Sequence, residues 1–305
     1  MPNLKHIKVR IKSIKSTQKI TQAMKLVAAS KVRRAQIRVL SSRPYTQQIV
    51  NFVQKAVSSI SSADKSLIPL MQERGRDMPQ HVSTVGIIVI SSDRGLCGSY
   101  NTNILKKAAR RIVELEKSGI KSKLITIGNK ANGFFKRTKV EILESFTQLP
   151  AVPNIELANL IAGSAENAFL NKTVDNVEII GTDFISMLRN EVYTKQFLPL
   201  MSEKSSSVSG QDESRPYTSS REIIFEPSLD SVLQSLLPLY LSNIIYHALL
   251  EASCSELASR MNAMSSATKN AKELIEKLTI VYNKARQAAI TQELSEIVGG
   301  VEALK

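Results

Sequence analysis

The first segment of the chain, from residue 4 to about residue 58, has the hydrophobic spacing of one long amphipathic helix. Apolar side chains recur mainly at intervals of three and four, and they form one stripe: Ile7, Ile11, Ile14, Met24, Ala28, Val32, Ala35 and Val39. No glycine interrupts this segment, but Pro44 lies inside it. Because proline removes an intrahelical hydrogen bond, we expect a kink at Pro44.

The hydrophobic period changes in the middle of the chain, where short apolar runs alternate with helical segments. Buried strands are predicted at 85–90, 123–127 and 177–184, and helices at 100–117 and 154–170. A last run, 192–200, is expected to pair with 184–188 as a hairpin. Strands that alternate with helices predict an open, Rossmann-like α/β domain. The serine-rich stretch 204–221 is expected to be a flexible surface insertion.

Helical spacing returns near residue 227 and continues to about 298, with Pro238 expected as an early break and Gly299 and Gly300 as the stop. Apolar or small residues then alternate at intervals of four and three: Leu250, Cys254, Leu257, Met261, Met264, Thr268, Ala271, Ile275, Leu278, Tyr282, Ala285 and Ala289. This pattern predicts a coiled-coil seam. Its small side chains allow a partner helix to approach closely, and the N-terminal helix is the nearest candidate.

The chain is predicted to divide into an N-terminal shaft helix at 1–60, a central α/β foot domain at 80–226 and a C-terminal shaft helix at 227–305. Helices of about 55 and 60 residues extend about 80 and 90 Å. A compact globule of 305 residues would be only about 50 Å across. We therefore expect the two terminal helices to form a long antiparallel coiled coil, with the α/β domain as a foot at one end.

The net charge of +14 is concentrated in one part of the chain. Residues 1–63 contain 13 Lys or Arg and no Asp or Glu, whereas the remainder carries 28 basic and 27 acidic groups. A solvated surface normally mixes both signs, so this segment is expected to face an acidic partner. Only Tyr45 and Phe52 are aromatic there, which leaves few platforms for stacking nucleic-acid bases. An acidic protein surface is therefore the favoured partner.

Several classes of protein and site are disfavoured by the sequence. No uninterrupted apolar run reaches about 18 residues and the first residues lack the apolar core of a signal peptide, so neither a membrane span nor a cleaved signal is expected. Cys97 and Cys254 lie outside any CxxC pair, which disfavours a disulfide framework and fits a reducing compartment. His6, His81 and His247 have no metal-binding spacing. We expect no metal and no cofactor.

The turn SSDRGLCG at 91–98 follows a predicted strand and opens a predicted helix, where nucleotide-binding folds place a phosphate loop. Its spacing matches neither GxGxxG nor GxxxxGK[ST]. We therefore expect a structural turn, shaped by its two glycines, in which Asp93 or Ser92 caps a helix or pairs with Arg94. Cys97 is expected to be a small buried side chain rather than a reactive thiol.

Four segments of the sequence, taken together, resemble a known protein family. They are IKSTQKITQAMKLVAASK at 14–31, SSDRGLCG at 91–98, SRMNAM at 259–264 with ATKNA at 267–271, and YNKARQAAITQEL at 282–294. In this order, they strongly resemble sequences of the gamma subunit of F-type ATP synthases. The matching segments cover both predicted shaft helices and the start of the predicted foot domain.

The resemblance implies a central-stalk rotor whose shaft lies in a ring of alpha and beta subunits. Its foot would bind the epsilon-type subunit and the ring of membrane-embedded c subunits. The residues implied to face the catalytic ring are Met24, Lys25 and Lys31 on the first helix and Arg286, Gln287, Thr291 and Glu293 on the second. In the foot, Phe225 and Glu226 stand where the family has a tyrosine-rich segment, and they are implied to contact the c-ring.

The function implied by the resemblance is mechanical coupling without catalysis by this chain. Because the family motif begins almost at Met1, the expected location is the cytoplasmic side of a bacterial plasma membrane, with the matrix side of the mitochondrial inner membrane as the alternative. Two other functions stay open. A dinucleotide-dependent enzyme would retain its cofactor, and a basic nucleic-acid scaffold would show salt-dependent polynucleotide binding.

The length of the predicted helices gives a testable expectation about the isolated chain. Since both helices outreach any globule of this mass, the radius of gyration measured by small-angle X-ray scattering should clearly exceed the value of about 19 Å expected for a compact chain. A value close to 19 Å would reject the shaft.

Overall fold

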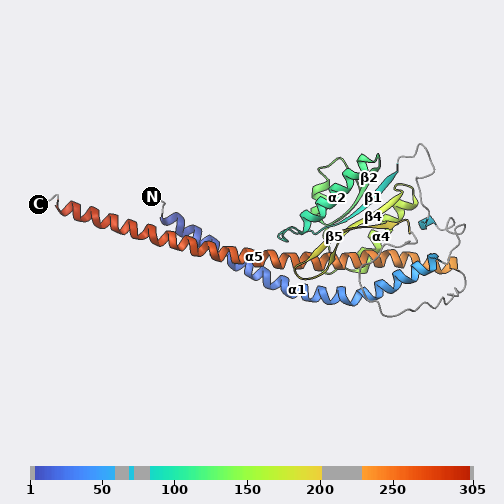
Figure 1. The fold of residues 1–305 in the computed structure, drawn as a ribbon, viewed down its shortest axis with the longest axis horizontal. Helices are drawn as coiled ribbons and strands as arrows, with labels where there is room; N and C mark the ends of the chain where they lie inside the picture. The colour runs from blue at the N-terminus through green and yellow to red at the C-terminus, as the bar shows by residue number, and fades with distance from the viewer. Residues whose placement is uncertain (1–3, 59–68, 72–82, 201–228, 303–305) are drawn as a thin grey trace. The chain divides into compact units, whose positions relative to one another are not determined.

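The computed structural model describes residues 4–58, 69–71, 83–200 and 229–302 (Figure 1). It contains two long helices, α1 (Leu4–Ser58) and α5 (Leu229–Glu302), and between them in sequence a mixed α/β domain. Internal contacts define two compact units. The helical unit comprises the described residues of 1–31, 96–98 and 257–305, and the sheet unit comprises those of 32–95 and 99–256. Each long helix therefore contributes to both units.

The sheet unit is built on a five-stranded sheet with the strand order β3-β2-β1-β4-β5. Its strands are β1 (Thr84–Ile90), β2 (Lys121–Ile127), β3 (Glu141–Phe146), β4 (Asn176–Phe184) and β5 (Asn190–Leu198). The first four pair in parallel, and β5 pairs with β4 in antiparallel orientation. The shorter helices are α2 (Tyr100–Lys117), α3 (Asn129–Phe135) and α4 (Ile155–Leu170). The predicted Rossmann-like architecture is confirmed.

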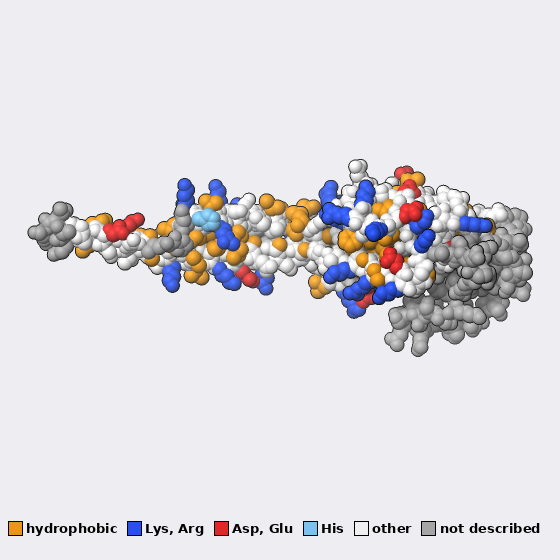
Figure 2. All heavy atoms as spheres, turned by 90° about the horizontal axis from the view of Figure 1, so that it is seen from above, with side chains coloured by type: hydrophobic (Ala, Val, Ile, Leu, Met, Phe, Trp, Pro, Cys, Tyr) orange, Lys and Arg blue, Asp and Glu red, His pale blue; other side chains and the backbone are white. Residues whose placement is uncertain are grey.

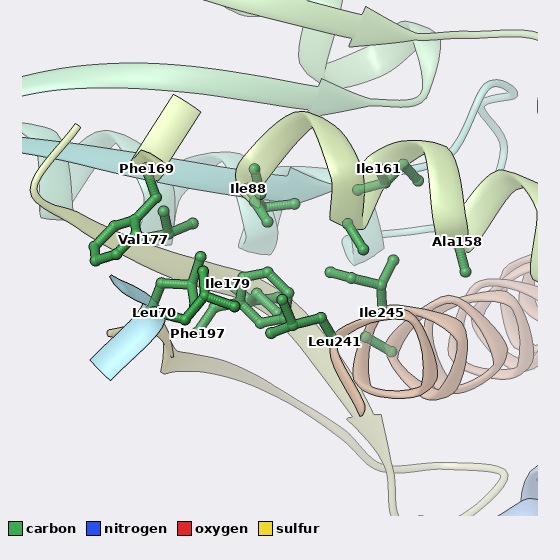
Figure 3. Close-up of a cluster of buried hydrophobic side chains, with 14 of the residues drawn as sticks. Leu70, Ile88, Ala158, Ile161, Phe169, Val177, Ile179, Phe197, Leu241 and Ile245 are labelled. Carbon is green, nitrogen blue, oxygen red and sulfur yellow. The ribbon is translucent and has the colours of Figure 1, made fainter. Parts of the chain in front are cut away.

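The main hydrophobic core lies on one face of this sheet, under α4 and α5 (Figure 3). Ile88 of β1 and Ile179 of β4 meet Ile161 of α4 and Ile245 of α5 there. Alternate residues of a strand point to opposite faces, so Ile87 of β1 points to the other side, where α2 packs. The strands are thus covered on both faces, which explains why β1 is a nearly continuous apolar run.

The apolar stripe predicted for α1 is confirmed. All eight of its positions are buried or half-buried, and Val32 and Val39 have no exposed surface. The helix runs through Pro44 without ending, and the kink there stays a prediction.

The hairpin was expected with the wrong pairing. Residues 190–198 pair with the whole of β4, from Val177 opposite Leu198 to Phe184 opposite Asn190, and 185–189 form the turn. The Ser186 side chain stabilises this turn. Its hydroxyl oxygen accepts hydrogen bonds from the backbone N–H of Leu188, at 3.3 Å, and from the backbone N–H of Arg189, at 3.1 Å. Phe184 is the last residue of β4, and the other apolar residues at 184–188, Ile185, Met187 and Leu188, belong to the turn.

Two further elements were not predicted, the helix α3 and the strand β3. Helix α3 has only seven residues and contains Gly133, so it shows less than two turns of periodicity. Strand β3 lies at the edge of the sheet, and no residue in it is fully buried. Neither element therefore carries the apolar pattern that marks a longer or more central one.

Both breaks expected in α5 were wrong. The helix continues through Pro238, where the neighbouring turns are fixed by the buried side chains of Leu233, Leu237 and Leu241. It also continues past Gly299 and Gly300 to Glu302, since glycine in a helix costs only about 1 kcal/mol relative to alanine. Part of α5 is apolar enough, by length and composition, to cross a membrane. Because its leucines pack on the sheet, we interpret that part as a core helix.

Between the predicted N-terminal helix at 1–60 and the predicted foot domain at 80–226, the structure describes one short 3₁₀ helix, η2 (Pro69–Met71). Its residues Leu70 and Met71 are buried, and the carbonyl oxygen of Leu70 accepts a hydrogen bond from the N–H of Leu200 at 2.9 Å. The predicted insertion 204–221 lies outside the described residues. The three-part division of the chain stays a prediction.

The ends of β1 and β2 approach each other so closely that only glycine fits at residue 128. The Ser91 hydroxyl donates to the carbonyl oxygen of Ile127 at 2.8 Å and accepts from the N–H of Ala131 at 2.9 Å. Gly128 has φ +89° and ψ 146°, and a Cβ placed there would lie 2.6 Å from the carbonyl oxygen of Ser91. Both the backbone conformation and the space therefore exclude a side chain.

Replacing this glycine should destabilise the sheet unit strongly. We expect Gly128→Ala to lower the free energy of unfolding by about 3 kcal/mol, from backbone strain together with the clash. Gly119→Ala is the matched control, because Gly119 also has a positive φ, +73°, but no atom within 4 Å of the added Cβ. It should cost about 1 kcal/mol. Urea unfolding followed by circular dichroism would compare them, and equal losses would contradict the close approach.

Candidate partner interface

Two polar side chains of the turn at 91–98 form hydrogen bonds with backbone groups inside and outside the turn. The Asp93 carboxylate accepts hydrogen bonds from the N–H of Asn129, at the start of α3, and from the N–H of Leu149. The Ser92 hydroxyl donates to the carbonyl oxygen of Arg94 at 2.7 Å. Asp93 thus binds an N–H at the start of α3, whereas at the start of α2, the helix that the turn opens, the side chain of the N-cap residue Ser99 forms no capping hydrogen bond in the described part of the chain. These side chains are engaged in shaping the turn, which favours the structural interpretation over a phosphate loop.

The left-handed residues of this turn are Leu96, with φ 63°, and Gly98, with φ 60°. Within the helical unit, a Cβ on Gly98 would lie 3.7 Å from the Cβ of Ala263 and 4.0 Å from the carbonyl oxygen of Ser259 on α5. The small residues of the segment 259–264 therefore let the turn pack directly on α5. Gly95, which was expected to shape the turn, does not have a positive φ.

Both cysteines are buried, and neither is part of a disulfide. Cys97 is only 2% exposed, as expected for a small packed side chain. Burial raises the pKa of the Cys254 thiol to about 12, and the nearby Glu251 carboxylate adds to this increase. Cys254 is therefore protonated at neutral pH, and neither cysteine has the exposed thiolate of a reactive site.

The coiled-coil seam of α5 is confirmed. Between 272 and 290, every residue is exposed except the predicted seam positions. The seam positions are half-buried: Ile275, Leu278, Tyr282, Ala285 and Ala289. In the helical unit α1 runs antiparallel to this part of α5 (Figure 1). The hydroxyl oxygens of Thr268 and Thr21 lie 2.9 Å apart, and the Thr268 hydroxyl oxygen is also 2.8 Å from the carbonyl oxygen of Met264. Ile7 and Ala28 of α1 are buried on the same stripe as Thr21.

The three predicted partner residues on α1 differ in exposure. Met24 and Lys25 are half-buried at the flank of the seam, one turn before the buried Ala28, whereas Lys31 is exposed. Part of the Met24 side chain is therefore accessible to a partner. Lys31 and most other basic residues of α1 are exposed. Figure 2 shows Lys and Arg side chains along the long helices.

The four predicted residues on α5 are all exposed. Within the part of the chain that the structure describes, the side chains of Arg286, Gln287 and Glu293 form no hydrogen bond or ion pair. The hydroxyl of Thr291 donates to the backbone carbonyl oxygen of Gln287 at 3.0 Å. From residue 290 to residue 300 every residue is exposed. The side chains of Arg286, Gln287 and Glu293 have no polar partner among the described residues, so they are available to a partner protein.

The sequence interpretation missed an apolar component of this surface. Ile290, Leu294, Ile297 and Val298 are 48%, 57%, 63% and 65% exposed. They lie at intervals of four, three and one, so they form a second stripe outside the seam. On α1, Leu26 is 65% exposed. Their helical spacing is the signal in the sequence that marks this second stripe.

Phe225 and Glu226, the residues implied to contact the c-ring, lie outside the described residues. For them the resemblance stays the only basis.

Comparison with known proteins supports the resemblance over the whole chain. Residues 3–304 match the family model described as ATP synthase. The chain is 43% identical, over 321 aligned residues that cover 100% of both chains, to the ATP synthase gamma chains of Trichormus variabilis and Crocosphaera subtropica. The gamma-subunit resemblance is therefore confirmed.

Solved structures show the same fold. A chain in the central stalk and c-ring of the Tetrahymena thermophila mitochondrial ATP synthase is 26% identical, with a TM-score of 0.57 and coverage of 81% of this chain and 99% of that one. A chain in the Euglena gracilis mitochondrial ATP synthase is 18% identical, with a TM-score of 0.66 and coverage of 99% and 94%, and it supports the fold alone. This chain belongs to the ATP synthase family, alongside the gamma chains that it matches from end to end.

Proposed function

We propose that this chain is the central-stalk rotor subunit of an F-type ATP synthase, and that it couples rotation of the c-ring to conformational change in the ring of alpha and beta subunits. The observation that carries the proposal is the end of α5, where residues 290–300 are all exposed and include four large apolar side chains. Such a surface is typical of a helix that is buried in a partner. The end-to-end match to gamma chains identifies the class of partner.

The charge of α1 fits the same arrangement. Eight Lys or Arg residues and no acidic residue lie between 4 and 31, within the helical unit. A helix of one sign is attracted to a surface of the opposite sign and can pass over it at many angles without a single locked geometry. We propose that Lys25 and Lys31 face acidic groups of the catalytic ring, with Met24 as an apolar contact beside them.

A rotor must act differently on each catalytic site, and the end of α5 has the required asymmetry. Adjacent residues of a helix lie about 100° apart, so Arg286 and Gln287 point to different neighbours. Thr291, four residues beyond Gln287, shares its face. Arg286 presents a planar donor fork, whereas Gln287 both donates and accepts hydrogen bonds. Contacts that exist at one rotary angle and not at the next supply the differential free energy that shifts each site between states.

At the foot, we propose contacts with the epsilon-type subunit and with the c-ring, the latter through Phe225 and Glu226. The chain would then be peripheral to the membrane and attached to it through the complex, on the cytoplasmic side of a bacterial plasma membrane or on the matrix side of a mitochondrial inner membrane. In this function the chain binds no nucleotide and catalyses no reaction, because it acts by presenting different surfaces as it turns.

Replacing Arg286 and Gln287 tests the proposed contact with the ring. In the purified complex, Arg286→Ala with Gln287→Ala should lower the steady-state ATPase rate several-fold while leaving assembly and helix content nearly unchanged. Both side chains are exposed, so the loss reflects contact with the partner rather than folding.

The control for this experiment is Lys277→Ala, an exposed exchange elsewhere on α5. It should keep wild-type ATP hydrolysis and proton pumping. Wild-type rates in the double variant would refute the contact assignment. Failure of the wild-type chain to copurify with alpha and beta subunits would refute the rotor proposal itself.

A further inference from the structure

A buried carboxylate ties the two long helices together in the sheet unit. The side chain of Glu251 on α5 is 3% exposed, and its Oε1 accepts a hydrogen bond from Nε of Arg43 on α1 at 2.9 Å. A carboxylate in the protein interior is unfavourable unless it is paired and hydrogen-bonded. Arg43 provides this pairing from the other helix.

The same pair holds the last residue of β4. Oε2 of Glu251 accepts a hydrogen bond from the N–H of Phe184 at 2.8 Å, and Nη2 of Arg43 donates to the carbonyl oxygen of Phe184 at 2.7 Å. Both backbone polar groups of one sheet residue are therefore bound by side chains from two different helices. We call Glu251, Arg43 and the Phe184 backbone the Glu251 clamp.

His247 lies beside the clamp on α5. Its Nε2 is 3.4 Å from Oε1 of Glu251, and its Nδ1 is 3.1 Å from the hydroxyl oxygen of Ser42 on α1. Burial lowers the pKa of His247, although the Glu251 carboxylate acts in the opposite direction. His247 is therefore uncharged at neutral pH, and Arg43 carries the positive charge that balances Glu251.

The clamp differs in kind from the other contacts between α5 and the sheet. The contacts of α5 in the main core are apolar and include Leu237, Leu241 and Ile245. Apolar burial resists separation, but it is non-directional and does little to fix the rotation of a helix about its own axis. Hydrogen bonds between charged groups are short and directional. The clamp therefore fixes the rotational setting of both helices against β4.

We propose that Glu251 is a positioning residue that holds α1 and α5 at a fixed angle to the sheet, so that torque passes between the sheet unit and the shaft helices without slip. This inference rests on the proposed rotor function. The position of the clamp suits the role, because the sheet unit ends at Glu256 of α5, shortly after Glu251, and the same helix continues into the helical unit.

The test uses the whole ATP synthase complex reconstituted in lipid vesicles. Glu251→Gln keeps the shape of the side chain but removes the charge that binds Arg43. ATP hydrolysis should stay within about twofold of wild type, whereas the number of protons pumped per ATP hydrolysed against an opposing gradient should fall about threefold or more. A purely structural defect would lower pumping and hydrolysis in equal proportion.

A second variant and a control make the test decisive. Arg43→Lys keeps the charge but loses the fork that binds Glu251 and Phe184 together, so it should lower the pumping ratio to a smaller extent. It also decides the matter if Glu251→Gln does not assemble. Glu273→Gln, at an exposed carboxylate of α5, should leave the ratio unchanged.

The possible outcomes separate the two proposals. Wild-type pumping ratios in Glu251→Gln or, where that variant does not assemble, in Arg43→Lys would overturn the clamp and leave the rotor function intact. A wild-type complex that hydrolyses ATP but pumps no protons would contradict the rotor function, and the role of the clamp with it.

Discussion

One continuous helix, α5, has to satisfy two different packing environments, and the rest of the structure depends on how it does so. In the sheet unit many residues of α5 are buried, because the helix lies against the sheet and forms part of the main core. In the helical unit, between residues 272 and 290, only the seam positions are half-buried, because a single antiparallel helix covers them. The sequence of α5 changes accordingly, from leucine-rich turns such as 233–241 to a seam that ends in alanines at 285 and 289. Helix α1 makes the same transition in reverse.

This constraint explains which parts of the structure could be predicted from sequence. The seam and the α1 stripe were predictable because a regular interval of three and four residues has one structural meaning over a long segment. The central strands were predictable because burial on both faces makes them continuous apolar runs. Strand β3 and helix α3 gave no such signal, since one is an exposed edge and the other has fewer than two turns. The breaks predicted at Pro238 and at Gly299 and Gly300 were wrong, because the low helix propensity of proline and glycine was outweighed by the helix around them.

The candidate interface was predictable only in part. The residues Arg286, Gln287, Thr291 and Glu293 came from family resemblance, and the structure adds that they are exposed. The second apolar stripe and the Glu251 clamp required coordinates. Arg43 and Glu251 are 208 positions apart, and no spacing rule connects a basic residue of one helix with an acidic residue of another. Long-range polar pairing is therefore the kind of feature that hydrophobic periodicity does not report.

The contact between Thr21 and Thr268 has a consequence for the alignment of the two helices. A seam that repeats every seven residues can pair again after a shift of one heptad, and its apolar contacts are non-directional, so a polar contact helps to specify the axial register. Thr268 is the one threonine among the seam positions, and one heptad away from Thr21 on α1 stand Ile14 and Ala28, which have no hydroxyl. A shift of one heptad would leave both groups without each other and would displace Arg286 by about 10 Å relative to Met24. The threonine pair thus fixes the axial register of the two helices, which keeps the polar end of α5 at a constant axial position relative to the basic residues of α1.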